Sequence, residues 1–181
     1  MMLGRIVFSF FLFIVFSGVN AQGKTEKKYP LGERGTLVVT VPDSWIEEVK
    51  QDDRTGGRTI SYSMARGTQP QVMVTPYWAP PGIPPVNKEL ARENTQRDIE
   101  GIKDQAVEKT IPIVEFAGKG GPGYYFDATD KAPKAGEYKY LRQGTLLVGD
   151  KLLIFTILSN SRQEPVLRDA MQMLQGAFFA K

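Results

Sequence analysis

The sequence predicts an α+β domain in which an antiparallel β-sheet of about six to seven strands is flanked by two main helices. Three observations lead to this fold class. Short segments with alternating apolar and polar residues recur along the chain, and turn residues separate them. Two other segments carry apolar residues at helical spacing. The segment 151–159 is apolar on both faces, which is typical of a strand with a layer above and below it.

The N-terminal residues have the layout of a secretory signal peptide. Arg5 precedes the apolar run 6–19, which is shorter than the roughly 20 residues that a membrane-spanning helix needs. Val19 and Ala21 then occupy the small-residue positions of a cleavage site. We therefore expect cleavage near Ala21 and export to the periplasm or the extracellular space. The competing interpretation is an uncleaved membrane anchor.

The remaining chain is predicted to contain one domain and no membrane span. Residues 1–21 form the signal peptide, and the polar residues 22–34 are interpreted as a disordered lead-in. Residues 35–181 then make a single domain, large enough to bury its own core. The formal net charge of the chain is only +3, and the segment 24–28 carries much of the basic excess. This charge gives no support for a nucleic-acid partner.

The first half of the predicted domain is built from strands and turns. Trp45 closes the turn that begins at Pro42, and we expect its ring to lie under the edge of the core. Pro76 cannot donate a backbone hydrogen bond, so we expect its end of the third strand to lie at an edge or to leave the sheet. The three strands are expected over 36–41, 58–65 and 71–78.

The second half is predicted to contain both helices and four strands. The middle helix covers 87–108, with Asn87 as its N-cap. The C-terminal helix covers about 162–178, where Met and aromatic residues recur at core spacing. Gly149 and Asp150 form a tight hairpin turn. The four strands are expected over 110–117, 124–130, 137–148 and 151–159.

The stretch GKGGPG at 118–123 has the G-x-G-x-x-G spacing of a dinucleotide-binding turn. Such a site requires a helix directly after the glycines, so that the helix N-terminus faces the pyrophosphate. The following residues, YYFDATD, instead alternate as a strand does. We interpret Gly118, Gly120 and Gly123 as a strand connection in which glycine adopts positive φ, and we expect no cofactor.

Catalytic and metal chemistry have few candidate residues. The sequence contains no histidine and no cysteine, which excludes Ser-His-Asp triads, cysteine nucleophiles and ordinary zinc sites. Asp127, Asp130 and Glu137 lack the ligand spacing of a calcium loop and are interpreted as solvated turn residues. We expect no catalytic and no metal residue, although a hydrolase that relies on carboxylates alone stays open.

Tyr77 and Trp78 are the candidate partner-binding residues. They lie in the proline-rich stretch 76–85, which could present rigid aromatic rings at low entropic cost. The alternative is that both rings fold back over the edge of the sheet.

The order of elements resembles the PsbP-like group of proteins. The resemblance rests on VPDSW ending the first strand, on the helix NKELARENTQRDIEGIKDQ, on GGPGYYFDAT, on the hairpin YKYLRQGTLLVGDKLLIFTI and on the closing helix, and it covers about residues 35–178. It implies an α/β/α sandwich and a non-catalytic role in binding or assembly. No functional residue carries over from it.

Together these observations predict an exported, non-catalytic domain that binds a protein or a component of the cell envelope. The alternatives are a carboxylate-dependent hydrolase, which needs facing acids in a cleft, and a carrier of a small ligand or lipid, which needs an apolar cavity.

Overall fold

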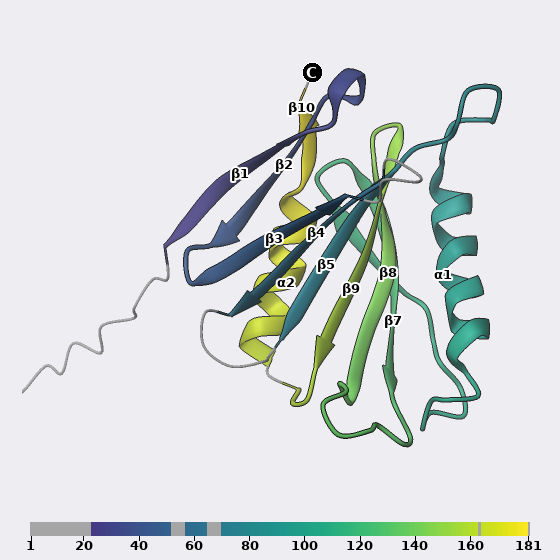
Figure 1. Cartoon of the computed structure of the whole chain (residues 1–181). Coiled ribbons are helices and arrows are strands. Elements are labelled where there is room, and N and C mark those ends of the chain that lie inside the picture. The colour runs from purple at the N-terminus through teal and green to yellow at the C-terminus, as the bar shows by residue number, and fades with distance from the viewer. Residues whose placement is uncertain (1–22, 52–56, 65–69, 163, 181) are drawn as a thin grey trace, which may run out of the picture.

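The computed structural model describes residues 23–51, 57–64, 70–162 and 164–180. Two antiparallel sheets and two helices make up this part of the chain (Figure 1). The small sheet has the strand order β1 (Lys24–Pro30), β2 (Thr36–Pro42), β10 (Phe178–Ala180). The large sheet has the order β3 (Trp45–Gln51), β4 (Arg58–Met64), β5 (Gln71–Tyr77), β9 (Lys151–Ser159), β8 (Tyr140–Val148), β7 (Gly121–Thr129), β6 (Val114–Gly118). The helices are α1 (Lys88–Ile102) and α2 (Glu164–Gly176), and a short 3-10 turn, η1 (Gly32–Arg34), joins β1 to β2.

The large sheet lies between two different layers. Helix α1 packs on β7 and β8 on one face, while α2 and the small sheet cover the other face (Figure 1). Leu152 and Leu153 are both fully buried, and because neighbouring strand residues point to opposite faces, they belong to two different cores. The predicted α+β class with two flanking helices is thus confirmed, and β9 does have a layer on each side.

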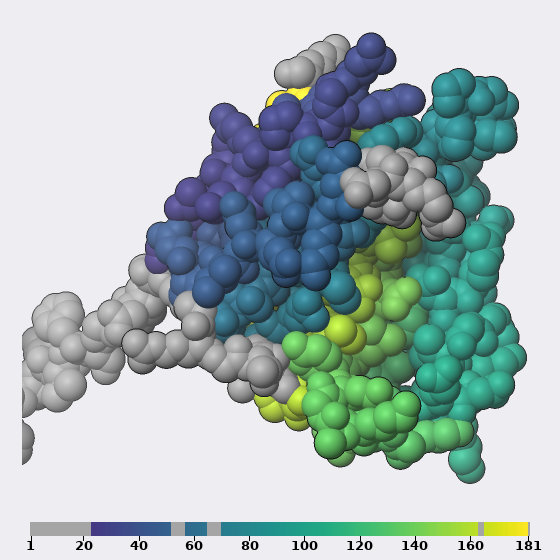
Figure 2. Space-filling view, viewed as in Figure 1, coloured from purple at the N-terminus to yellow at the C-terminus, as the bar shows by residue number. Residues whose placement is uncertain are grey.

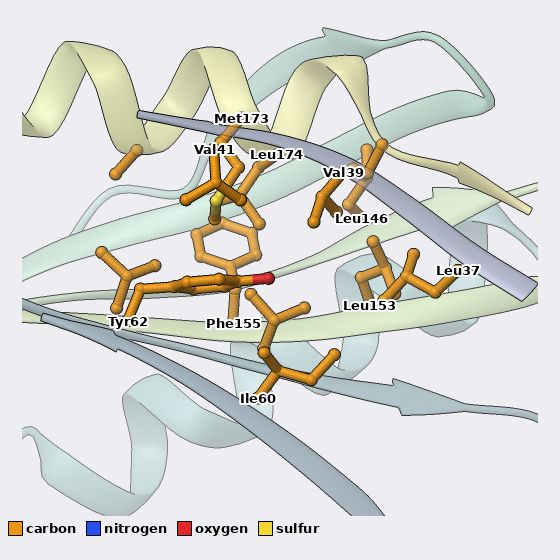
Figure 3. Packing of buried hydrophobic residues seen from close by; sticks show 14 of the residues in the cluster. Leu37, Val39, Val41, Ile60, Tyr62, Leu146, Leu153, Phe155, Met173 and Leu174 are labelled. Atoms are coloured by element: carbon orange, nitrogen blue, oxygen red, sulfur yellow. The ribbon is translucent and has the colours of Figure 1, made fainter. Parts of the chain in front are cut away.

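The main core fills the space between the large sheet, the small sheet and α2. Side chains of β2 and α2 point toward side chains of β4, β8 and β9 (Figure 3). Tyr62 and Phe155 are the largest fully buried side chains of this cluster. Burial of apolar surface contributes roughly 25 cal/mol per Å², so this cluster is a main source of the stability of the fold. Its labelled members are Leu37, Val39, Val41, Ile60, Tyr62, Leu146, Leu153, Phe155, Met173 and Leu174.

Helix α1 begins where the sequence predicts. The side chain of Asn87 accepts a hydrogen bond of 2.8 Å from the backbone N–H of Leu90, as an N-cap residue does. The helix ends at Ile102 rather than at residue 108, because Ala106 leaves the helical path and pairs with Asp130 in an isolated bridge. The buried stripe of Ala91, Thr95 and Ile99 holds the helix on the sheet.

The prediction of a disordered lead-in over 22–34 is wrong for the described residues. Residues Lys24–Pro30 form β1, which pairs with β2 along its whole length. Only Tyr29 is buried among them, and its hydroxyl donates a 2.5 Å hydrogen bond to Glu47 of β3. The charged side chains lie on the exposed parts of an edge strand, where the sequence pattern is indistinguishable from that of a solvated tail.

Two further strands were not expected. Strand β3, Trp45–Gln51, starts at the residue assigned to the end of a turn, and it pairs with β4. Trp45 is partly buried and its ring lies 6.3 Å from that of Tyr62, as expected for a ring under the edge of the core. Strand β10 follows α2, which ends at Gly176 instead of continuing to residue 178.

Strand β5 lies inside the sheet, between β4 and β9, although Pro76 predicted an edge. Its pairing with β4 covers only Gln71 to Val74, whereas its pairing with β9 continues to Tyr77. Pro76 therefore faces a partner strand on one side only. The end of β5 that contains the proline is a local edge of the sheet. A residue without a backbone N–H is tolerated at such a position because the hydrogen bonds between the strands are not disrupted.

The glycine stretch at 118–123 contains the end of β6, the tight turn of the β6–β7 hairpin and the first residues of β7, so a strand and not a helix follows the turn. The expected reason for the glycines, positive φ, applies to Gly121 but not to Gly118, Gly120 or Gly123. Those three are required by close approach instead. A Cβ atom at Gly120 would lie 2.7 Å from a methyl carbon of Val148, and a Cβ at Gly123 would overlap the ring of Phe116.

Candidate functional site

The candidate functional site is a groove between α1 and the face of the large sheet. Figure 2 shows this face hollowed between β3–β5 and α1, with β8 and β9 at the base of the hollow. The groove has a volume of about 390 Å³. Helix α1 covers the β7–β8 half of this face, so the groove lies where the helix layer stops. Its lining residues are Tyr77, Leu90, Asn94, Arg97, Asp98, Gln143, Thr145 and Ile154.

Helix α1 supplies the polar wall of the groove. Leu90, Asn94, Arg97 and Asp98 follow one another at helical spacing, on one side of the buried stripe. Arg97 donates a 3.2 Å hydrogen bond to the side-chain oxygen of Asn94, which lies one turn earlier on the same wall. The wall therefore presents an amide, a guanidinium and a carboxylate that are already arranged by the helix.

Alternate residues of β8 supply the floor. Gln143 donates a 2.8 Å hydrogen bond through Nε2 to Oδ2 of Asp98, so the floor and the wall are tied together. Thr145 lies two residues further on the same face of the strand. Its neighbour on β9 is Ile154, which has no side-chain group that could donate or accept a hydrogen bond.

Thr145 carries a buried hydroxyl without a hydrogen-bond partner. The residue is 1% exposed, and its Oγ1 is the buried side-chain atom left unpaired among the described residues. An unpaired buried hydroxyl costs about 1–3 kcal/mol, so folded proteins rarely retain one without a role. Thr145 is one of the residues that line the groove, so this unpaired hydroxyl lies directly beneath the surface on which a ligand would sit.

The two aromatic candidates from the sequence are separated by the structure. Tyr77 ends β5, is 40% exposed and lines the groove. Trp78 lies against η1, where the guanidinium of Arg34 is 5.5 Å from the centre of its ring. The residues therefore do not form one aromatic surface, and only Tyr77 belongs to the groove.

The carboxylates of Asp127, Asp130 and Glu137, interpreted from the sequence as solvated turn residues, do not form a shared site, and Asp127 lies in β7 rather than in a turn. Asp127 makes a bidentate ion pair with Arg142, with distances of 2.7 and 2.8 Å. Asp130 and Glu137 accept hydrogen bonds from backbone N–H groups in their own turns. Within the described part of the chain, no three acidic residues are grouped so that they could hold a metal ion.

Another carboxylate, Glu108, closes the loop after α1. It accepts hydrogen bonds from the backbone N–H and the hydroxyl of Thr129, at 2.8 and 2.7 Å. Partial burial acts to raise the pKa of Glu108, but these two hydrogen bonds and the nearby Arg162 lower it overall below its ordinary value. The residue fixes the loop against β7 and lies outside the groove.

A buried hydroxyl network joins the small sheet to the large sheet on the opposite side. Tyr62 donates a 2.9 Å hydrogen bond to the hydroxyl of Tyr29, which in turn donates to Glu47. Burial, followed by the hydrogen bond to Glu47, raises the pKa of Tyr29 far above its ordinary value. Burial also raises the pKa of Tyr62, although its bond to Tyr29 acts in the opposite direction. Every hydroxyl here has a partner, unlike Thr145.

Of the residues that line the groove, sequence reasoning singled out Tyr77 as a candidate for partner binding and none of the others. One signal was present on the strand: Gln143 and Thr145 are polar residues two positions apart, so they share one face of a largely apolar strand pair. A second signal was present on α1, where Asn94 and Asp98 flank the narrow apolar stripe. Neither signal shows that the two elements meet, because that depends on how α1 crosses the sheet.

Comparisons with known proteins agree with this architecture. The chain resembles the solution structure of cyanobacterial PsbP (CyanoP) from Synechocystis sp. PCC 6803, with a TM-score of 0.55, 13% sequence identity, and coverage of 90% of this chain and 96% of the other. The fold is PsbP-like. It also resembles LpqN of Mycobacterium tuberculosis, described as involved in cell envelope biogenesis, with a TM-score of 0.51, 12% identity, and coverage of 87% and 92%. No family model and no curated protein sequence matches the chain.

The resemblance expected from VPDSW, the hairpin and the two helices is therefore confirmed at the level of the PsbP-like fold. At sequence identities of 12–13%, no functional role can be assigned to a residue of the groove from these similar structures. The functional argument consequently rests on the groove itself.

Proposed function

We propose that the protein is an exported, non-catalytic binding domain that acts on a component of the cell envelope, and that the groove beside α1 is its binding site. The observation that carries this proposal is the buried, unpaired hydroxyl of Thr145 on the floor of a groove whose other polar groups are already positioned. Preorganised polar groups around a hollow of this volume are typical of small-molecule and partner sites. The signal-peptide layout of residues 1–21 supports export, and LpqN, which has a similar fold, is described as involved in cell envelope biogenesis.

Binding is better supported than catalysis. The lining of the groove contains one carboxylate, Asp98, and this group is engaged by Gln143. Hydrolysis of a glycoside by carboxylates uses a pair that faces the scissile bond. The carrier alternative is also less well supported, because side chains of the main core fill the space between the two sheets (Figure 3).

The location is part of the proposal. The residues assigned to the signal peptide lie outside the described part of the chain. Among the described residues, neither helix is long and apolar enough to cross a bilayer. We propose that the domain acts in the periplasm or outside the cell, after cleavage near Ala21.

The test is capture of the purified protein by washed cell-envelope material from the source cells, measured by co-sedimentation. Tyr77→Ala removes an aromatic ring from the groove, whereas Trp78→Ala removes the neighbouring ring that lies against Arg34. We expect Tyr77→Ala to lose most of the capture and Trp78→Ala to keep it. Undiminished capture of Tyr77→Ala, with both variants folded by circular dichroism, contradicts the assignment of the groove.

A further inference from the structure

We infer that the groove binds an uncharged saccharide, an inference that rests on the proposed binding role of this groove. Five of the lining residues have polar or charged side chains other than the ring of Tyr77: these are the amides of Asn94 and Gln143, the carboxylate of Asp98, the guanidinium of Arg97 and the hydroxyl of Thr145. Neighbouring hydroxyl groups of a sugar both donate and accept hydrogen bonds. They can therefore pair with amide, carboxylate and hydroxyl groups at once.

The charge of the lining selects against a charged ligand. Arg97 and Asp98 carry opposite charges and follow one another in the sequence, so the groove has no excess of either sign. An anionic ligand would meet Asp98, and a cationic ligand would meet Arg97. Binding of either would leave one charge close to a like charge, which lowers affinity. A neutral ligand with many hydrogen-bonding groups can contact both Arg97 and Asp98 without such a penalty.

An extended peptide is a poorer fit to the same surface. Peptides that bind to sheets pair with the free backbone groups of an edge strand. Here the floor is the face of β8 and β9, and β8 is paired with β7 on one side and β9 on the other, so its backbone groups are engaged in the sheet. Apolar pockets for peptide side chains would have to be formed by Leu90 and Ile154.

Tyr77 adds the aromatic contact that a sugar ring uses. Its side chain is 40% exposed at the end of β5 and lines the groove. The face of an aromatic ring carries partial negative charge, which attracts the C–H groups on one face of a pyranose ring. A sugar has an apolar face of C–H groups and an edge of hydroxyl groups. The ring of Tyr77 would contact the apolar face, and the polar groups of the floor and the wall would pair with the hydroxyl groups. The volume of about 390 Å³ suits a short saccharide.

The unpaired hydroxyl of Thr145 provides the specific test. Purified, biotinylated protein is assembled on streptavidin and applied to an array of neutral, anionic and cationic glycans. We expect retention of a subset of neutral glycans. Thr145→Val keeps the shape of the side chain and removes its hydroxyl, and we expect it to reduce retention by about tenfold or more. Thr40→Val is the matched control, because Thr40 is exposed on β2 in the small sheet.

The outcomes separate this inference from the proposed function. Retention of neutral glycans that falls in Thr145→Val but not in Thr40→Val supports a saccharide site. Absence of glycan retention, preference for charged glycans, or equal retention by Thr145→Val overturns it. If no glycan on the array retains the protein while envelope capture still depends on Tyr77, the groove binds a different class of ligand and only the saccharide inference fails. If capture is also independent of Tyr77, both proposals fail.

Discussion

Thr145 holds a hydroxyl in a position where valine would fill the same space. Its burial at 1% exposure and the absence of a partner for Oγ1 mean that the folded state loses the hydration of this group and gains no hydrogen bond in return. We therefore expect Thr145→Val to increase the free energy of unfolding by about 1 kcal/mol. The measurement is urea unfolding of the wild type and the variant.

The same variant, Thr145→Val, tests both the stability of the fold and the binding of glycans. A gain in stability together with weaker glycan retention would show that the hydroxyl serves binding at the expense of the fold. A loss of stability of more than about 1 kcal/mol would show instead that the hydroxyl has a structural partner in solution. The matched variant Thr40→Val changes an exposed residue and is expected to leave stability nearly unchanged.

The Tyr29–Tyr62 pair makes stability sensitive to alkaline pH. Both tyrosines have a pKa raised above 10.0 in the folded state, by burial first and, for Tyr29, by the hydrogen bond to Glu47. In the unfolded chain they lose their protons near pH 10, while the folded state retains them. The unfolded state thus binds fewer protons there, and stability falls as the pH rises above about 10.

Tyr29→Phe tests this linkage. The variant removes one of the two raised groups, so we expect a shallower loss of stability above about pH 10 than in the wild type. At neutral pH it should be destabilised by about 1–3 kcal/mol, because the hydroxyl of Tyr62 loses its acceptor. Melting temperatures measured from about pH 8 to 11 give both effects. Parallel curves for the two proteins would exclude the pair as the source of the pH dependence.

At the scale of elements, the β6–β7 hairpin requires glycine for a steric reason. A Cβ at Gly120 would lie 2.7 Å from a methyl carbon of Val148 and 2.9 Å from its Cα, in the neighbouring β8–β9 hairpin. The backbone atom cannot move without shifting the strand. We expect Gly120→Ala to cost about 1–3 kcal/mol of stability, measured by thermal unfolding.

Gly101 provides the control for this substitution. It lies in the last turn of α1, and a Cβ there would meet no atom within 4 Å. Because alanine favours helix more than glycine does, Gly101→Ala should stabilise the protein by about 0.5–1 kcal/mol. Equal effects of the two substitutions would show that the turn at Gly120 is not close-packed.

Sequence reasoning found the elements that are encoded by a pattern of neighbouring residues. Strands β7, β8 and β9, the cap at Asn87 and the turn at Gly149 all follow from neighbouring residues. Strands β1 and β3 were misread because each lies at the edge of a sheet, where charged residues such as Lys27 and Glu48 are tolerated. Strand β10 has three residues, too few for alternation to show.

The site was less predictable than the fold. Tyr77 and Trp78 were candidates because they are adjacent in a proline-rich stretch, with burial over the sheet edge as the alternative. In the structure Tyr77 lines the groove, whereas Trp78 lies against Arg34. Gln143 and Asp98 are far apart in the chain, and they meet because α1 crosses β8. The crossing is set by packing of the helix on the sheet, which no local pattern encodes.

At the scale of the whole molecule, the small sheet depends on β1. This strand pairs with β2 along seven residues and supplies Tyr29 to the main core. We expect a protein that starts at Leu31 to melt at a clearly lower temperature than one that starts at Gly23, because β2 loses a partner strand and Tyr29 is removed from the core. Calorimetry of the two proteins measures the difference. Equal melting temperatures would restore the interpretation of residues 24–30 as a dispensable tail.

The small sheet joins segments that lie far apart in the sequence, because β10 pairs with Thr36–Val38 of β2. Contacts of such large sequence separation carry a large entropic cost of loop closure. We therefore expect the pairing of β10 with β2 to form late in refolding, after the local hairpins of the large sheet.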